Sequence, residues 1–210
     1  MHSLGILLEA DYKGVISGRE SPIAGLRKAF SAHPYPTPPN PLTRVRGTEE
    51  EERRAAPAQP TYELMNRDSA ILLAKEAARA GVKAFGFVSA AAGTPVLPDR
   101  YISTKREAEA VVAREFPEMR GVFFRPPFMY DKSRGVTMGV AAVARAGSVV
   151  DELTGGVLKG VFGAAVTKPL KVDVVADAVV EALEDEGVKG PVEVRELEEL
   201  AGRAWRKTML

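Results

Sequence analysis

The chain has 210 residues, a length that supports one domain with its own hydrophobic core rather than two. Its 29 Lys and Arg residues nearly balance its 28 Asp and Glu residues, so charge offers no argument for binding nucleic acid or an anionic membrane. The absence of cysteine excludes disulfides, a thiol nucleophile and thiolate-bound zinc, and two histidines are too few for a multi-histidine metal centre. The sequence contains no apolar run of about 18 residues, so we expect no transmembrane helix.

The N-terminal third of the sequence shows the least regular pattern of apolar and polar residues. Met1 to Ala10 lacks the basic residues of a secretory signal or a mitochondrial presequence, and its apolar residues resemble the end of a buried strand. Residues 31–60 carry seven of the fifteen prolines together with a block of charged residues from Glu49 to Arg54. A segment so poor in large apolar residues cannot form a packed core. We therefore predict a single domain over 1–210 in which 31–60 is a Pro-rich, mobile surface insertion.

Helices and strands are predicted to alternate from Tyr62 onward. The helices show apolar residues at spacings of three and four, and Asp173 is predicted to cap the helix that follows it. The strands are continuous apolar runs, which indicates a parallel sheet buried between helices. The fold class is therefore predicted to be α/β. The expected helices cover 62–81, 101–116, 137–146, 174–184 and a C-terminal stretch to about 205, and the expected strands cover 82–88, 121–124 and 191–194.

The pattern with the clearest chemical content is Tyr101-Ile-Ser-Thr-Lys105. Residues four apart share one face of a helix, and Ala108 and Val112 continue that face with apolar side chains. Tyr101 and Lys105 are thus expected at the mouth of an inward-facing stripe. Taken alone, the pattern is short, and a lysine that lays its aliphatic stem over apolar surface would explain it equally well.

Three further features strengthen the functional interpretation. Ser89 follows one predicted strand and Arg125-Pro126 follows the next, so both lie at carboxyl ends, where open parallel sheets bind their ligands. Asn66 lies inside a predicted helix, where asparagine is unfavourable without a specific role. Each feature has an ordinary explanation, as a cap, a strand end or a satisfied buried amide, but their joint occurrence in this order is hard to attribute to chance.

In this order, Asn66, Ser89, Tyr101-x-x-x-Lys105 and Arg125-Pro126 resemble the atypical and extended short-chain dehydrogenases/reductases of the NAD-dependent epimerase/dehydratase superfamily. The phrases Phe87-Val-Ser-Ala-Ala-Ala-Gly93, Tyr101 to Glu109 and Arg125 to Asp131 are most similar to fungal mitochondrial members associated with coenzyme Q biosynthesis. Those members are similar in turn to the NADPH-holding accessory subunit of respiratory complex I. The resemblance covers residues 1–30 and 61–210.

The resemblance implies a cofactor, NADP or NAD, and a set of roles. Lys105 would lower the pKa of the Tyr101 phenol and hold the nicotinamide ribose, and Tyr101 would act as general acid or base. Ser89 would hydrogen-bond the substrate oxygen, and Asn66 would hold the local backbone or a relay water. The remaining cofactor-binding residues implied are Gly5, Arg125, Pro126, Pro127, Phe128 and Met129.

The phosphate-binding turn of such proteins is missing from the sequence, which contains neither G-x-G-x-x-G nor G-x-x-G-x-x-G. The text around Gly5 resembles the segment that follows the fourth strand in the family. We therefore expect a partial Rossmann-like, doubly wound parallel sheet that lacks its first strands. The strand over 82–88 would then form an apolar edge, and the 210-residue chain alone would be poorly soluble or partly unfolded.

Three functions stay open at this stage. The first is an oxidoreductase of mitochondrial ubiquinone biosynthesis that acts on an unidentified small molecule. The second is a non-catalytic, nucleotide-holding or assembly subunit of a mitochondrial complex. The third is an interaction fragment without the cofactor half. The resemblance implies a location on the matrix side of the inner membrane and a quinone-biosynthesis complex as partner.

Overall fold

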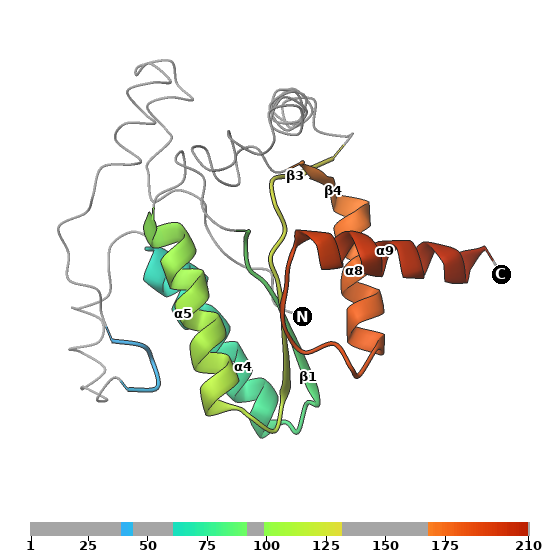
Figure 1. Cartoon of the computed structure of the whole chain (residues 1–210). Helices are drawn as coiled ribbons and strands as arrows, with labels where there is room; N and C mark the ends of the chain where they lie inside the picture. The colour runs from blue at the N-terminus through green and yellow to red at the C-terminus, as the bar shows by residue number, and fades with distance from the viewer. Residues whose placement is uncertain (1–38, 44–60, 92–98, 132–167, 210) are drawn as a thin grey trace, which may run out of the picture.

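The computed structural model describes residues 39–43, 61–91, 99–131 and 168–209, which place two helical layers around a small sheet (Figure 1). Three strands form the sheet in the order β1 (Ala84–Val88), β2 (Arg120–Phe124) and β5 (Gly190–Val192), and all pairings are parallel. The prediction of an α/β fold with a parallel sheet is confirmed. Helices separate consecutive strands, as parallel pairing requires.

The helices of one layer precede the first two strands. The predicted first helix begins as a π-helix, η1 (Glu63–Asp68), and continues as α4 (Ser69–Arg79). Gly81 follows α4 with a φ of +71°, a backbone conformation that suits glycine at a helix end. Helix α5 (Asp99–Glu115) follows β1 and precedes β2 in the chain. Helices α4 and α5 lie side by side against the sheet (Figure 1).

The second layer contains α8 (Val172–Glu184) and α9 (Val194–Thr208). A two-stranded parallel sheet of β3 (Met129–Tyr130) and β4 (Leu170–Lys171) leads into α8. The prediction that Asp173 caps this helix is wrong, because the extended residue Lys171 is the N-cap and Asp173 lies in the first helical turn. Helix α9 begins with a capping box in which Glu193 and Glu196 satisfy each other's backbone N–H groups.

The two faces of the sheet carry separate cores, which follow from the alternation of side chains along each strand. Phe123 packs with Phe85 and Phe87 against α4 and α5. The next residue, Phe124, packs with Val122 and Val192 against α8 and α9. We refer to these as the α4–α5 face and the α8–α9 face.

One partly buried contact ties the sheet to the end of α8. The Arg120 guanidinium, at the start of β2, donates to the carbonyl oxygens of Ala182 at 3.0 Å and Leu183 at 2.7 Å. It also donates to the carbonyls of Asp185 and Val188 in the turn that follows α8. The last carbonyls of a helix lack intrahelical donors, so this cation caps the C-terminus of α8 from another element.

Within the described strands, β1 and β5 are the two ends of the main sheet. In β5 the Val192 carbonyl accepts from the Arg125 N–H beside β2, so the neighbouring Pro191 turns its backbone toward the outer side. Proline has no N–H to donate there. The outer side of β5 is therefore poorly suited to pair with a further strand.

Part of the predicted insertion is described. Residues Asn40 to Thr43 form a turn in which the Asn40 carbonyl accepts from the Thr43 N–H, and the Pro39 carbonyl accepts from Arg67 at 3.2 Å. The rest of 31–60, the helix predicted over 137–146 and Gly5 lie outside the described residues. In the described ranges, no helix is both long and apolar enough to cross a membrane.

Candidate functional site

Lys105 lies at the carboxyl end of β1, on the side of α5 that faces the sheet. Its Nζ donates to the Val88 carbonyl at 3.0 Å, and the side chain is only 5% exposed. The ammonium lies 5.2 Å from the centre of the Phe87 ring and 5.6 Å from the centre of the Tyr101 ring. The predicted shared face of Tyr101 and Lys105 is therefore present in the structure.

Burial lowers the pKa of Lys105 to about 8, because the charged ammonium is removed from water. The nearby Glu109 carboxylate opposes this effect, and the Arg106 guanidinium adds to it. A buried cation between two aromatic rings is partly compensated by their electron-rich faces.

Tyr101 differs from the expectation. Its ring packs edge-on against Tyr62, with 6.1 Å between ring centres, and burial raises the pKa of its phenol above the ordinary value. The prediction that Lys105 lowers this pKa is not met, because desolvation of the phenolate dominates. The Lys105 ammonium lies over the ring and donates its hydrogen bond to Val88. In this arrangement the Tyr101 phenol is protonated at neutral pH.

Ser89 and Asn66 are both buried where the sequence predicts them. Ser89 follows β1, and its N–H donates to the Phe124 carbonyl at 2.7 Å. Its Oγ accepts from Arg106 Nη1 at 3.0 Å, whereas no hydrogen bond joins it to Tyr101. Asn66 lies inside η1 and has no exposed surface. A π-helix places an extra residue in one turn and is often found at functional sites.

Arg125 was predicted to bind cofactor, but two carboxylates surround its guanidinium. Its Nε donates to both oxygens of Glu109, its Nη2 makes a short contact to Glu109 Oε2, and its Nη1 donates to Glu193 at 2.6 Å. These partners raise its pKa further. Arg125 thus serves as an internal link between α5 and the start of α9.

The segment after β2 divides into a buried and an exposed part. Pro126 and Pro127 are buried, and the Pro126 carbonyl accepts from the Ala91 N–H at 2.8 Å. Phe128 is 42% exposed and Met129 is 36% exposed. Two exposed apolar side chains at the carboxyl end of a central strand are suited to contact a flat ligand.

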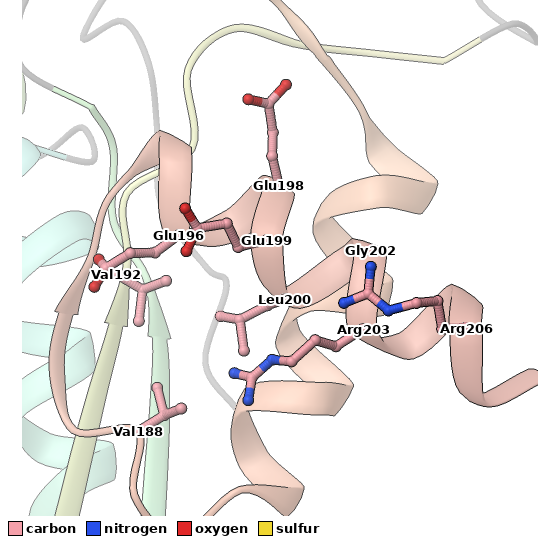
Figure 2. A pocket seen from close by; sticks show the side chains of 9 residues that line it. All are labelled: Val188, Val192, Glu196, Glu198, Glu199, Leu200, Gly202, Arg203 and Arg206. Atoms are coloured by element: carbon pink, nitrogen blue, oxygen red, sulfur yellow. The ribbon is translucent and has the colours of Figure 1, made fainter.

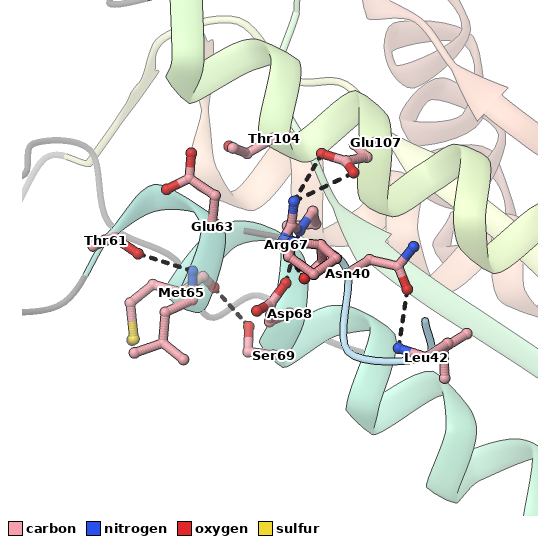
Figure 3. A network of polar contacts seen from close by, with 12 residues as sticks. Asn40, Leu42, Thr61, Glu63, Met65, Arg67, Asp68, Ser69, Thr104 and Glu107 are labelled. Atoms are coloured by element: carbon pink, nitrogen blue, oxygen red, sulfur yellow. Dashed lines mark hydrogen bonds and ion pairs between the residues drawn. The ribbon is translucent and has the colours of Figure 1, made fainter. Parts of the chain in front are cut away.

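Sequence reasoning missed a second polar cluster, around Arg67 (Figure 3). The fully buried Arg67 donates to Asp68 Oδ1 at 2.7 Å and to both oxygens of Glu107 on α5. Beside it, Arg100 forms a bidentate pair with the buried Glu63, which lowers the pKa of that carboxyl. These ion pairs join η1 to α5 and fix the helix that carries Tyr101. The alternation of Arg and Glu along the helices is the signal that was available.

A cavity of about 480 Å³ lies elsewhere, between β5 and α9 (Figure 2). It contains none of the predicted site residues, which gather at the carboxyl ends of β1 and β2. Its lining residues are Val188, Val192, Glu196, Glu198, Glu199, Leu200, Gly202, Arg203 and Arg206. No group of three or more metal-ligating side chains occurs within the ranges that the structure describes.

In the structure, Ser89 and the Tyr101–Lys105 pair lie at the carboxyl end of β1, and Asn66 lies in η1, which is joined to α5 by ion pairs. A curated protein similar to the chain is MIOREX complex component 2 of Saccharomyces cerevisiae, which is 35% identical over 147 residues. The match covers 64% of this chain and 48% of that protein, so the chain spans about half the length of this relative.

Two solved structures show partial similarity, and no family model matches the chain. The UDP-Glc/GlcNAc 4-epimerase of Campylobacter jejuni has a TM-score of 0.39 and 15% identity, covering 66% of this chain and 54% of that one. The Bordetella bronchiseptica enzyme WbmG in complex with NAD has a TM-score of 0.40 and 16% identity, covering 74% and 54%.

Proposed function

We propose that this chain is an NAD(P)-dependent oxidoreductase-type protein of the short-chain dehydrogenase superfamily. One observation carries the proposal: Tyr101 and Lys105 share a face of α5 at the carboxyl end of β1, with Nζ 5.6 Å from the centre of the phenol ring. A nicotinamide cofactor, when bound, would supply or accept the hydride. The residues of the chain would orient it and move the accompanying proton.

The residues around this point fit such a cofactor. The Lys105 ammonium has three N–H groups, and its hydrogen bond to Val88 uses one of them, so it retains donors for a ribose hydroxyl. Phe128 and Met129 offer exposed apolar surface for the nicotinamide ring. Arg125 is committed to Glu109 and Glu193, so we assign it a supporting role rather than direct contact.

Tyr101 is the proton donor in this proposal. A phenol that is protonated at neutral pH is a proton donor, so Tyr101 Oη would protonate the oxygen of a carbonyl substrate as its carbon is reduced. We therefore propose reduction of a carbonyl or quinone-type compound. The proposed setting is mitochondrial ubiquinone biosynthesis, on the matrix side of the inner membrane.

The setting is supported by resemblance. The sequence resembles fungal members associated with coenzyme Q biosynthesis, and the similar yeast protein is named as a component of the MIOREX complex. A mitochondrial complex is accordingly the proposed partner.

A second candidate is a nucleotide-holding assembly subunit without turnover. Its support is that Lys105 does not lower the pKa of the Tyr101 phenol, which burial raises instead. Under this alternative, Lys105 would still hold the nucleotide.

The two candidates differ in their response to Tyr101→Phe. The experiment measures the thermal shift with NADPH and with NADH, and the nucleotide oxidation with a panel of quinones, for the chain and for this variant. Tyr62→Phe is the matched control, because it removes a hydroxyl from the neighbouring ring. A ligand at 100 times its Kd stabilises the folded state by about 2.7 kcal/mol.

Turnover that is lost only in Tyr101→Phe, with an unchanged thermal shift, supports the oxidoreductase. A thermal shift without turnover in either protein supports the assembly subunit. Absence of a shift with both nucleotides contradicts both candidates for this chain.

A further inference from the structure

The carboxylate of Glu109 is buried one helical turn after Lys105 and holds two guanidinium groups. It is 4% exposed. Arg106 Nη1 donates to Glu109 Oε1 at 2.5 Å, and Arg125 approaches the other side of the carboxylate with Nε and Nη2. Such charge-assisted pairs are strong and directional, because guanidinium and carboxylate match in geometry.

Each guanidinium continues to a different part of the site. Arg106 donates to Ser89 Oγ at 3.0 Å and to the Ala90 carbonyl at 2.7 Å, and so fixes the chain at the end of β1. Arg125 extends to Glu193, the N-cap of α9, and precedes the two prolines that lead to Phe128. A single carboxylate therefore connects the ends of β1, β2 and β5.

We propose that Glu109 is a positioning residue, which orients Ser89 through Arg106 and the Arg125–Met129 segment through Arg125. Its importance for catalysis rests on the proposed function, whereas its effect on Ser89 and Lys105 does not. The same chain of contacts assigns Arg106 the task of setting the direction of the Ser89 hydroxyl.

The charge of Glu109, and not only its shape, is required by its surroundings. Lys105, Arg106 and Arg125 are three cations within its immediate neighbourhood, and the Arg125 side chain is only 18% exposed. Removing one partner of a buried ion pair leaves uncompensated charge, which is strongly unfavourable. An isosteric amide at position 109 would keep the packing and remove the compensation.

The test uses Glu109→Gln, with Glu109→Asp as the conservative variant and Glu115→Gln as the control at an exposed glutamate of the same helix. The first readout is the titration of the Lys105 ammonium by NMR in the free protein. The titratable or charged groups that act on it are Tyr101, Arg106 and Glu109. The second readout is hydrogen exchange of the Ser89 and Ala91 amides, which bond to Phe124 and Pro126.

We expect Glu109→Gln to move the Lys105 pKa below about 8, because the charge that raises it is lost. We expect exchange of the Ser89 and Ala91 amides to accelerate roughly tenfold or more, as loss of a charge-assisted hydrogen bond supports. Glu109→Asp should recover part of both effects, and Glu115→Gln should change neither. An unchanged Lys105 pKa and unchanged exchange in a folded Glu109→Gln variant overturn the proposal.

If Glu109→Gln does not fold, Arg106→Gln tests the same link, because it removes only the arm that reaches Ser89. If the Ser89 amide of Arg106→Gln exchanges faster than in the unsubstituted chain while the Val122 amide, in the centre of β2, is unchanged, the proposal is supported. If exchange at both amides changes by the same factor, or at neither, the proposal is contradicted. Nucleotide binding is measured separately on all variants. If the unsubstituted chain binds no nucleotide, the proposed function is contradicted. The Lys105 titration and the amide exchange still test the role of Glu109 in that case.

Discussion

The two faces of the sheet are built from different materials. On the α8–α9 face the core is aliphatic apart from Phe124, and Glu181 is the one buried charged residue among those described there. On the α4–α5 face the core is interleaved with buried polar and charged residues of η1, α5 and the end of β1. These are Glu63, Asn66, Arg67, Asp68, Ser89, Thr104, Lys105 and Glu109.

The difference separates stability from chemistry. Aliphatic packing stabilises without demanding particular partners, whereas each buried polar group needs a partner to offset its loss of hydration. In the described residues every buried side-chain polar atom has one. The interior of the α4–α5 face thus holds polar groups whose directions are fixed by their partners. The α8–α9 face supplies much of the apolar burial that stabilises the sheet.

The largest expected effect compares adjacent phenylalanines on opposite faces. Phe123→Ala and Phe124→Ala should each lower the free energy of unfolding by about 3–5 kcal/mol, because both remove a buried aromatic ring. Only Phe123 is paired in register with Phe87, over which Lys105 lies. Chemical denaturation combined with the Lys105 NMR titration measures both effects. Phe123→Ala is therefore the variant expected to shift the Lys105 titration. A titration that shifts in Phe124→Ala but not in Phe123→Ala would contradict the comparison.

The next effect tests the buried cation of the α4–α5 face. The pKa of Lys105 falls from 10.5 to about 8 on folding, so the unfolded chain binds more protons between these values, and stability should rise with pH from 8 to 10. Above pH 10 the raised pKa of Tyr101 acts in the opposite direction. Relative to Lys105→Met, the unsubstituted chain should gain about 2–3 kcal/mol over this interval. Parallel pH–stability curves for the two proteins would show that Lys105 titrates normally.

A smaller effect is expected at the link between β2 and α8. Arg120→Ala removes the guanidinium that donates to two carbonyls at the end of α8 and two in the turn that follows, and should destabilise the chain by about 2 kcal/mol. Arg120→Lys keeps the charge but has fewer N–H donors, so it should retain part of the stability that Arg120→Ala loses. Hydrogen exchange in the last turn of α8 would locate the loss, and equal exchange in all three proteins would refute the cap.

The smallest effect is expected at the surface of the α4–α5 face. Glu76 and Arg79 form an exposed pair at 2.9 Å on α4. Because water screens such pairs, Arg79→Ala should change stability by about 0.5 kcal/mol or less, and less still in high salt. Denaturation at two salt concentrations measures it. A larger effect would show that charge on this face acts at its surface as well as in its interior.

The positions of the predicted site residues followed from simple periodicities. Helical spacing placed Tyr101 and Lys105 on one face, and the apolar runs placed Ser89 and Arg125 at neighbouring strand ends. Their interactions were not predictable, because they depend on which donor reaches which acceptor after packing. Arg106 and Glu109 have the ordinary spacing of an exposed helix pair, and the spacing does not reveal that Arg125, which follows β2, also reaches this buried carboxylate.

Three other differences have local causes. The register of η1 requires one extra residue in a turn, which a pattern of three and four does not reveal. Asp173 has the residue type of an N-cap, but β4 ends at Lys171, and the helix starts at once at Val172. The raised pKa of Tyr101 reflects burial, a quantity that sequence spacing does not contain.

The proline in β5 has a consequence for self-association. Fibrillar and sheet-to-sheet growth requires successive backbone donors along a strand, and Pro191 removes one from the outward side of this short strand. Of the two strands that end the described sheet, β5 is therefore the poorer template for pairing with a strand of another molecule. Strand addition to the described sheet would be expected at β1 rather than at β5.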